Sequence, residues 1–168
     1  MWSVTCADMT IKVGDKVPDV EVRTMGPDGP ASVRTGEVLG QGRVVLFAVP
    51  GAFTPGCSKV HLPGFVSGAD ELKKRGVDTI ACVAVNDAWV MDAWGQAQGA
   101  GDKILMLADG NGEFAEAMGL AFDAAAVGLG TRSQRYAAVI EDGTITKLDV
   151  ESKPGIDVSS CESVLSQL

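Results

Sequence analysis

Short blocks of hydrophobic residues, separated by Gly, Pro and Asp, recur along the chain and predict β-strands. The clearest block is Arg43-Val44-Val45-Leu46-Phe47-Ala48-Val49, which is bounded by Gly42 and Pro50. A continuous β-branched and aromatic run of this length is typical of a strand that is buried on both faces, as in a parallel sheet. Further strands are expected over residues 20–24, 31–34, 78–85 and 104–107. Near the C-terminus, Asp142-Gly143 is a strong two-residue turn signal and predicts a hairpin of 135–141 with 144–150.

Helical spacing of apolar residues separates these strands. One helical stretch is expected over 54–75, and a second over about 87–98, capped by Asn86 or Asp87. The apolar stripe of the second helix is expected to contain Val90, Trp94 and Ala97. Shorter helices are expected over residues 112–118 and 161–168. The alternation of strands and helices predicts a three-layer α/β fold with a mixed central sheet, closed by a C-terminal hairpin plus helix.

Length and composition fit one folded unit. The chain has 168 residues, of which 46% are apolar, so it can bury a core without disulfide bonds. We expect a single domain over 1–168, with 1–10 as a leader segment of little pattern.

The charge balance argues against a nucleic-acid partner, and the lengths of the apolar runs argue against a membrane partner. Fourteen basic and 22 acidic residues give a net charge of −8, and the basic residues are scattered singly apart from Lys73-Lys74-Arg75. A nucleic-acid-binding surface needs clustered basic residues, so we expect no nucleic-acid partner. No apolar run approaches the roughly 20 residues that span a bilayer, and the N-terminus has no signal-peptide pattern. We therefore expect no membrane partner and a cytoplasmic location.

Four cysteines, Cys6, Cys57, Cys82 and Cys161, are widely spaced and form no C-x-x-C pair. With a single histidine, His61, they do not suit a tetrahedral zinc site. Cysteines in a reducing compartment are buried, catalytic or redox-active more often than disulfide-bonded. The Gly-x-Gly segments at 40–42 and 128–130 precede strands and lack the strand–turn–helix context of a phosphate loop. We expect neither a metal nor another cofactor.

The most informative segment is 50–58, where a buried strand ends and a helix begins. Thr54 suits the N-cap and the following proline suits the first helical position, which places Cys57 in the first turn. Unpaired backbone N–H groups and the positive end of the helix dipole stabilise an anion there, so Cys57 is expected to be a nucleophilic thiolate. Thr54 faces the same pocket, and Pro50 and Phe53 are expected to supply apolar walls.

Two other candidate side chains have plainer interpretations. Cys82 lies among the apolar residues of a strand and is expected to be core packing. His61 follows Cys57 by four residues, which raises a Cys–His hydrolase as an alternative. The nucleophile and base of such enzymes usually come from separate elements, and Pro63 interrupts the helix. We therefore expect His61 to be a polar group behind the site or at a helix end.

The motif Pro50-x-x-x-Thr54-x-x-Cys57 resembles the peroxiredoxin signature, and residues 49–58 and 61–65 resemble its type V (type II) branch. The likeness continues through residues 84–87, 107–110 and 130–136. It covers nearly the whole chain from about Ile11 onward. The resemblance implies a thioredoxin-like fold, a homodimer, and the reduction of hydrogen peroxide and alkyl hydroperoxides.

The resemblance also implies roles for individual residues. Cys57 is then the peroxidatic cysteine. Thr54 would hydrogen-bond the peroxide, Pro50 would shield the sulfur, and Arg135 would stabilise thiolate and peroxide. Chemistry agrees, because cleavage of the O–O bond by sulfur needs a thiolate and donors aimed at the developing charge. Arg132 competes for the role of the cation, but Arg135 begins a predicted strand and matches the family position.

Attack on peroxide leaves a sulfenic acid, which must condense with a thiol. Atypical two-cysteine relatives use a resolving cysteine near the C-terminus, which makes Cys161 a candidate. Cys82 is a second candidate, although it is expected to be buried, and Cys6 is expected to be incidental. We expect reduction by an external thiol, either glutathione with glutaredoxin or thioredoxin, with Cys161 as a candidate internal resolver.

Two other function classes stay open at this point. A redox sensor or thioredoxin-like binding module would use a reactive Cys57 without turnover. A thiol–disulfide oxidoreductase is disfavoured by the lack of a C-x-x-C pair. The C-terminal Ser166-Gln167-Leu168 only loosely resembles a peroxisomal address, so a cytoplasmic location is preferred. A peroxisomal or mitochondrial location is the alternative for a eukaryotic source.

Overall fold

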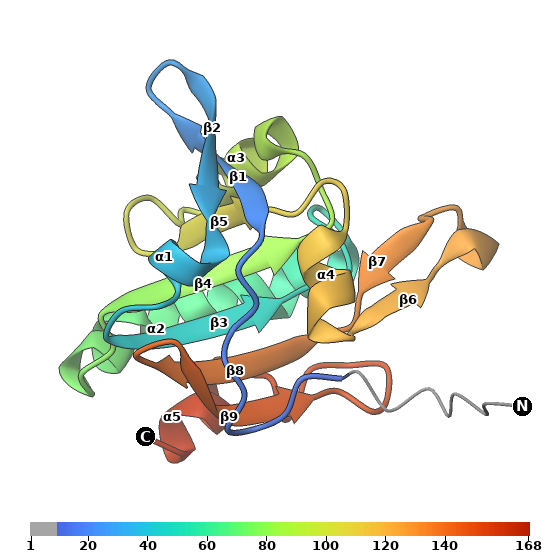
Figure 1. The fold of residues 1–168 in the computed structure, drawn as a ribbon. Coiled ribbons are helices and arrows are strands. Elements are labelled where there is room, and N and C mark those ends of the chain that lie inside the picture. Colours follow the sequence, from blue (N-terminus) through green and yellow to red (C-terminus); the bar gives the residue numbers. More distant parts are fainter. Residues whose placement is uncertain (1–9) are drawn as a thin grey trace, which may run out of the picture.

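The structure, a computed structural model, describes residues 10–168, so Cys6 and most of the expected leader lie outside the described residues. A seven-stranded sheet has the order β2-β1-β5-β4-β3-β8-β9 (Figure 1). Its strands are β1 (Glu21–Gly26), β2 (Gly29–Arg34), β3 (Arg43–Ala48), β4 (Thr79–Ala84), β5 (Leu105–Ala108), β8 (Tyr136–Glu141) and β9 (Thr144–Val150). β3, β4 and β5 are parallel neighbours, whereas the other pairs are antiparallel, which confirms the predicted mixed sheet.

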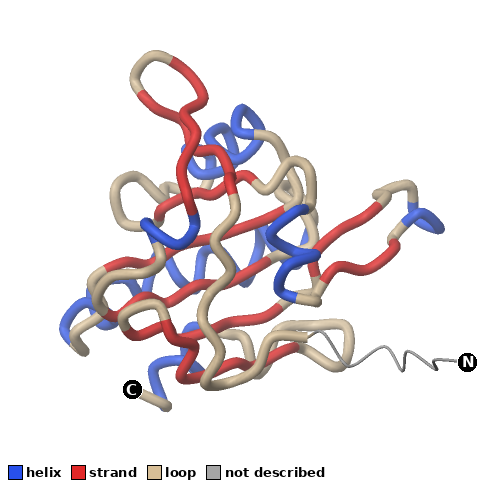
Figure 2. The backbone as a smooth tube through the Cα atoms, in the orientation of Figure 1, coloured by secondary structure: helices blue, strands red, loops and turns tan. Residues whose placement is uncertain are grey.

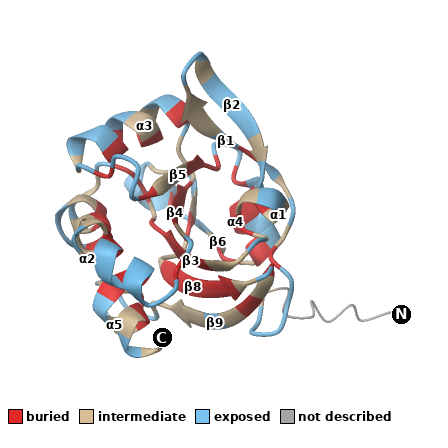
Figure 3. Cartoon of the chain, turned by 90° about the vertical axis from the view of Figure 1, so that its left-hand side faces the viewer, coloured by how far each residue is buried: buried red, intermediate tan, exposed pale blue. Residues whose placement is uncertain are grey.

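Helices cover both faces of the sheet, so the fold has three layers (Figure 3). The helices are α1 (Thr35–Val38), α2 (Leu62–Lys74), α3 (Ala88–Ala97), α4 (Glu113–Met118) and α5 (Cys161–Ser166). Side chains of α2, α3 and α5 share one core with the sheet, and those of α4 share the core on the opposite face, beside α1. Within residues 10–168, no helix is long and apolar enough to cross a membrane.

The central strand β3 shows why its sequence is apolar at every position after Arg43. Val45 and Phe47 point into the core beneath α2, whereas Val44 and Leu46 point into the core on the other face. All four side chains are fully buried. A strand with helices on both sides needs apolar residues at every position, as predicted.

The predicted turn between β8 and β9 is formed by Asp142 and Gly143. Their φ angles are 47° and 83°, and two positive values in succession are what a tight type I′ hairpin requires. Besides this hairpin and that of β1 with β2, the structure contains a hairpin that was not expected from the sequence. It consists of β6 (Ala121–Asp123) and β7 (Thr131–Ser133), joined through the 3-10 turn η2 (Ala125–Val127), and extends away from the main sheet (Figure 2).

Two helical predictions need correction. The helix expected over 54–75 contains a π-helical segment, η1 (Cys57–His61), before α2 begins. In α3, Asp87 is the N-cap, and its side chain accepts a hydrogen bond from the N–H of Val90 at 2.8 Å. Ala97, expected on the apolar stripe, is instead exposed. The buried face of α3 consists of Ala88, Met91, Trp94 and Gly95.

Candidate active site

Cys57 lies just beyond the carboxyl end of β3, where a loop leads into the helix. The backbone N–H of Ala52 in this loop donates to the side-chain oxygen of Asn86 at 2.9 Å, which ties the ends of β3 and β4 together. Phe53 has a φ of 62° and a side chain that is 53% exposed. A left-handed backbone at a bulky residue costs of order 1 kcal/mol. Phe53 is therefore a strained, solvent-facing residue, and the expected buried wall from this side chain is not formed.

Thr54 begins the helical backbone, as predicted. Its carbonyl accepts the first helical hydrogen bond, from the N–H of Ser58 at 2.9 Å. Its hydroxyl does not cap the helix but donates to the carbonyl of Gly51 at 2.6 Å. The side chain of Thr54 thereby closes the loop in front of Cys57.

The helix turn that carries Cys57 is wider than the α-helical turn expected from the sequence. The N–H of Leu62 donates to the carbonyl of Cys57, five residues earlier, which makes the segment π-helical. Pro63 accounts for this, because it has no N–H to donate and its ring clashes with a carbonyl four residues earlier in a regular helix. In the structure Pro63 lies in the first turn of α2, where proline is tolerated.

Arg135 joins Cys57 to His61. Its Nη2 donates to Sγ of Cys57 at 3.1 Å, and its Nη1 lies 2.8 Å from Nδ1 of His61. Arg135 immediately precedes β8, which fixes its backbone. Cys57 is 0% exposed, so a charged donor is needed to stabilise a thiolate where water does not reach. Arg135 therefore lies where a cation that stabilises the Cys57 thiolate would have to lie. Its part in the reaction stays a prediction.

His61 is held as a neutral imidazole. Its Nε2 lies 2.8 Å from the carbonyl oxygen of Ser159, which only accepts, so Nε2 carries the proton and Nδ1 accepts from Arg135. Burial, and then the charge of Arg135, lower the pKa of His61 to about 4, although the bond to Ser159 opposes this shift. Both ring nitrogens are engaged and neither bonds to Cys57. The Cys–His hydrolase arrangement is therefore not formed, and His61 lies behind the site as expected.

Arg132, the competing cation, contacts backbone carbonyls. Its Nε donates to the carbonyl of Leu129 at 2.9 Å, and its Nη1 donates to the carbonyl of Pro50 at 3.4 Å. Pro50 is half-buried at the start of the loop. Arg132 thus supports the loop, and the geometry favours Arg135 as the cation beside the sulfur.

Cys82 belongs to the core, as predicted. It lies in β4, in register with Phe47 of β3 and Met106 of β5. Its side chain is 0% exposed. Burial, and then the neighbouring sulfur of Cys57, raise the pKa of the Cys82 thiol well above its usual range. The thiol is therefore neutral and weakly nucleophilic.

Cys161 lies at the start of α5, packed against α2. Its sulfur occupies the space that a side chain at Gly68 would need. Burial, and then Glu162, raise the pKa of Cys161 to about 11. Gly68 follows Cys57 by 68 − 57 = 11 residues, which is about 16 Å along a helix. A disulfide needs Cα atoms within about 7 Å, so the structure does not bring Cys57 and Cys161 together.

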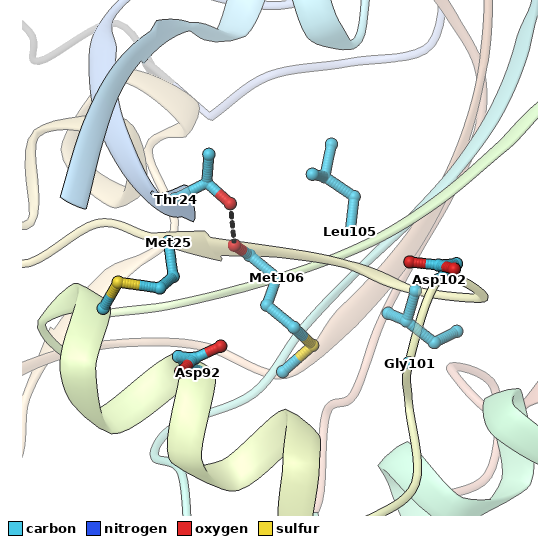
Figure 4. A pocket seen from close by; sticks show the side chains of 8 residues that line it. Thr24, Met25, Asp92, Gly101, Asp102, Leu105 and Met106 are labelled. Atoms are coloured by element: carbon cyan, nitrogen blue, oxygen red, sulfur yellow. Dashed lines mark hydrogen bonds between the residues drawn. The ribbon is translucent and has the colours of Figure 1, made fainter. Parts of the chain in front are cut away.

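A cavity of about 480 Å³ adjoins the site and is lined by both Pro50 and Arg135. Its other lining residues are Phe122, Gln134, Glu151, Lys153, Pro154 and Gly155. This cavity leads from the surface to the predicted catalytic arginine. A different cavity, of about 320 Å³, opens between β1, β5 and α3 (Figure 4). There the hydroxyl of Thr24 donates to the carbonyl of Met106 at 3.1 Å, and no predicted site residue is present.

Sequence reasoning missed two residues beside His61, namely Ser159 and Glu151. One oxygen of Glu151 accepts from the N–H of Ser159 at 2.9 Å, from its hydroxyl at 2.7 Å, and from the N–H of Asp157 at 2.6 Å. Ser159 and His61 are 98 positions apart in the chain. No local pattern indicates a contact over that separation, so only the folded chain reveals it.

Comparison with known proteins agrees with this geometry. The Redoxin family profile matches residues 12–165. The chain is 44% identical to peroxiredoxin-2E, chloroplastic, of Arabidopsis thaliana, over 99% of this chain and 73% of that protein. It is 49% identical to peroxiredoxin-2E-2, chloroplastic, of Oryza sativa subsp. japonica, over 95% of this chain and 73% of that protein.

A solved structure extends the agreement to three dimensions. Reduced Prx3 of Vibrio vulnificus, in complex with hydrogen peroxide, is 47% identical. It superposes with a TM-score of 0.90 over 94% of this chain and 99% of that chain. The chain belongs to the Redoxin family, and within it to the peroxiredoxins, which are thiol peroxidases of the thioredoxin-like superfamily.

Proposed function

We propose that Cys57 reduces hydrogen peroxide and alkyl hydroperoxides and that an external thiol restores it. The observation that supports this most directly is the 3.1 Å contact between Nη2 of Arg135 and Sγ of Cys57. The same guanidinium can hold the thiolate before attack and stabilise charge on the peroxide oxygens during attack. The Vibrio vulnificus relative was solved with hydrogen peroxide, which supports this substrate.

The proposed reaction has an oxidative and a reductive half. In the first, the Cys57 thiolate attacks one peroxide oxygen, so that an S–O bond forms while the O–O bond breaks. The sulfur becomes a sulfenic acid, and the other oxygen takes a proton and leaves as water or an alcohol. In the second half, one thiol condenses with the sulfenic acid and releases water. A second thiol then displaces the Cys57 thiolate and leaves in a disulfide.

Thr54 and Pro50 would act on the peroxide itself. The hydroxyl proton of Thr54 is committed to the carbonyl of Gly51, so its oxygen keeps lone pairs that can accept a hydrogen bond from a peroxide O–H. Pro50 lines the cavity that adjoins Arg135. Its ring offers no donor and would limit the access of water to the sulfur.

An external reductant, glutathione with glutaredoxin or thioredoxin, is favoured over Cys161 because about 16 Å of helix separates Cys57 from the residue on which Cys161 packs. Peroxide-treated protein should be digested and its disulfides mapped. We expect no stoichiometric Cys57–Cys161 disulfide, and finding one would overturn the external-thiol proposal.

Pairing of two copies is proposed from family likeness. Several large apolar side chains are exposed on the described surface, among them Phe53, Trp89, Phe122 and Val127. Covering such side chains is a common reason for association. Sedimentation of the wild type beside Trp89→Lys tests this, since a monomeric wild type would contradict it.

A cytoplasmic location is likewise a proposal, and the two relatives named for the chloroplast make that organelle the alternative for fractionation.

Turnover with defined reductants tests the proposal as a whole. Steady-state peroxide consumption should be measured with glutathione and glutaredoxin, with thioredoxin and its reductase, and with each enzyme alone. At least one complete system should support many turnovers per Cys57. A protein that consumes one equivalent of peroxide and stops with every reductant would be a sensor instead.

A further inference from the structure

Behind Arg135 lies a closed ring of hydrogen bonds. The backbone N–H of Glu151 donates to the carbonyl of Arg135 at 2.9 Å. The carboxylate of Glu151 accepts from the N–H and the hydroxyl of Ser159 at 2.9 and 2.7 Å. The carbonyl of Ser159 accepts from Nε2 of His61, and Nδ1 of His61 accepts from Nη1 of Arg135, both at 2.8 Å. The ring starts at the backbone of Arg135 and returns to its side chain.

We propose that Glu151 is a positioning residue for the guanidinium of Arg135. It orients Ser159, the carbonyl of Ser159 sets the tautomer of His61, and His61 then holds Nη1 so that Nη2 points at Cys57. This inference rests on the proposed role of Arg135 in the peroxidase reaction.

The tautomer of His61 is the critical link in the ring. A neutral imidazole carries one proton, and whichever nitrogen lacks it becomes the acceptor. While the Ser159 carbonyl takes the Nε2 proton, Nδ1 is free to accept from Arg135. If that carbonyl turned away, the buried Nε2 proton would lose its acceptor, and the tautomer with a proton on Nδ1, which faces the guanidinium donor against donor, would become relatively less unfavourable. Arg135 would then lose one of the two contacts that fix it beside Cys57.

Packing leaves the imidazole few other ways to respond. The ring of His61 packs at the side of Phe47 and Phe65, with centroid distances of 5.1 and 5.6 Å. These two rings stack on each other with centroids 4.0 Å apart. His61 is 1% exposed and is held against these two rings, although it also lines a cavity of about 500 Å³. We therefore expect a change at Ser159 to act first on the tautomer of the ring.

A carboxylate suits the position of Glu151 better than a neutral side chain. Its Oε1 accepts three hydrogen bonds, two from Ser159 and one from the N–H of Asp157. The negative charge strengthens all three bonds, whereas the amide oxygen of glutamine is neutral and its NH₂ group cannot accept, so glutamine would bind these donors more weakly. Ser159 is fully buried and has no water to replace a lost partner. Burial alone would raise the pKa of Glu151, but the hydrogen bonds from Ser159 and Asp157 lower it, so the group is ionised at neutral pH.

The test compares Glu151→Ala and Glu151→Gln with the matched control Glu141→Gln. Glu141 lies at the other end of β8, where it pairs with Arg43 at 2.8 Å, so the control removes the same charge far from the ring. The second-order rate constant for oxidation by hydrogen peroxide is measured in single turnover. His61 is the chain's single histidine, so ¹⁵N NMR of its imidazole reports the tautomer without ambiguity.

For the wild type we expect the tautomer protonated at Nε2. Glu151→Ala should give a mixture of tautomers and a rate constant lower by about tenfold, as is common when a residue that orients a catalytic group is removed. Glu151→Gln should give a tautomer ratio and a rate constant between those of the wild type and of Glu151→Ala. This second variant keeps the test decisive if the alanine variant does not fold. Glu141→Gln should stay within about twofold of wild type.

The outcomes separate this inference from the proposed reaction. A lower rate with an unchanged tautomer would overturn the inference alone, because Glu151 would not act through His61. A changed tautomer with an unchanged rate would also overturn the inference alone, because Arg135 would then act without His61; the role of Arg135 itself is tested by Arg135→Lys. Unchanged tautomer and rate in both Glu151 variants would leave Glu151 a purely structural residue.

Discussion

Cys57 and Cys82 are buried to the same extent and belong to the same core beneath α2, yet their surroundings differ. Cys57 lies on a π turn at the end of a strand, with a guanidinium nitrogen 3.1 Å from its sulfur. Cys82 lies within β4, between the apolar neighbours Phe47 and Met106. Burial alone therefore does not distinguish a reactive cysteine from an inert one.

The difference lies in what accompanies each sulfur. Burial penalises a thiolate at both positions, because charge is poorly solvated in a protein interior. At Cys57 a guanidinium nitrogen lies 3.1 Å from the sulfur, whereas at Cys82 the same arginine acts only as a distant and minor influence. A strand interior has its backbone donors committed to the sheet, while the first turn of a helix leaves them unpaired. The comparison suggests four measurements.

The largest effect is expected from exchanging each sulfur for oxygen. Cys57→Ser should lower the rate of peroxide consumption by more than about 10³-fold, since the serine hydroxyl is not ionised and is a weak nucleophile. Cys82→Ser should keep most of the activity. A reductant-coupled assay of both variants checks this, and a Cys57→Ser protein with near-normal turnover would refute the assignment of the nucleophile.

The second largest effect on the rate is expected from replacing the guanidinium of Arg135, which contacts two partners with two nitrogens. Arg135→Lys keeps a positive charge but offers one nitrogen in place of the two that contact Cys57 and His61, so the rate constant with hydrogen peroxide should fall by about a hundredfold. Arg132→Lys, which alters only contacts to carbonyls, should cause a smaller loss. Stopped-flow oxidation of the two variants ranks them. If Arg132→Lys proved the more damaging, Arg132 would replace Arg135 as the cation.

The Cys57 region should also make stability depend on pH. The pKa of His61 is about 4 in the fold and about 6.5 in an unfolded chain. Between these two pKa values the unfolded chain binds more protons than the folded chain. The stability that neutral His61 contributes is therefore fully present above pH 6.5 and is lost as the pH falls toward 4. Between pH 7 and 5 the free energy of unfolding should drop by about 2 kcal/mol. Urea unfolding of the wild type and of His61→Gln measures this, and equal slopes for both would contradict it.

The smallest effect concerns the inert sulfur. Cys82→Ala removes one buried atom the size of a methyl group, which should lower the free energy of unfolding by about 1 kcal/mol. Peroxide reduction should be unaffected, because Cys82 contacts none of the predicted catalytic side chains through a hydrogen bond in residues 10–168. Parallel unfolding and rate measurements would contradict the core assignment if activity fell while stability did not.

Local signals in the sequence were enough for much of the fold. The run 43–49 predicted β3 because a strand covered on both faces must be apolar throughout, and Asp142-Gly143 predicted its hairpin because few residues adopt two positive φ angles. The position of Cys57 at a helix start followed from Thr54 and the proline after it. These features depend on neighbours in the chain, which a single sequence displays.

Features that depend on distant partners were not visible. The π turn has a local cause in Pro63, but the sequence indicates only that the helix is interrupted there and not how wide the turn becomes. The hairpin of β6 and β7 has three-residue strands, too short to leave a period in the sequence. Glu151 and Ser159 belong to a segment without regular structure, and their meaning comes only from His61, far away in the chain.

The π turn also bears on how often the buried sulfur becomes accessible. A macromolecular reductant cannot touch Cys57 until the backbone around it opens, because the side chain is 0% exposed. Within η1 the helical bond of Leu62 spans five residues, and Pro63 adds no N–H. Opening this stretch breaks fewer well-aligned bonds than opening α2, so its amide protons should exchange with deuterated water faster than those of α2. If an external thiol resets Cys57 as proposed, the width of this one helical turn would govern how often the oxidised sulfur is exposed to that thiol.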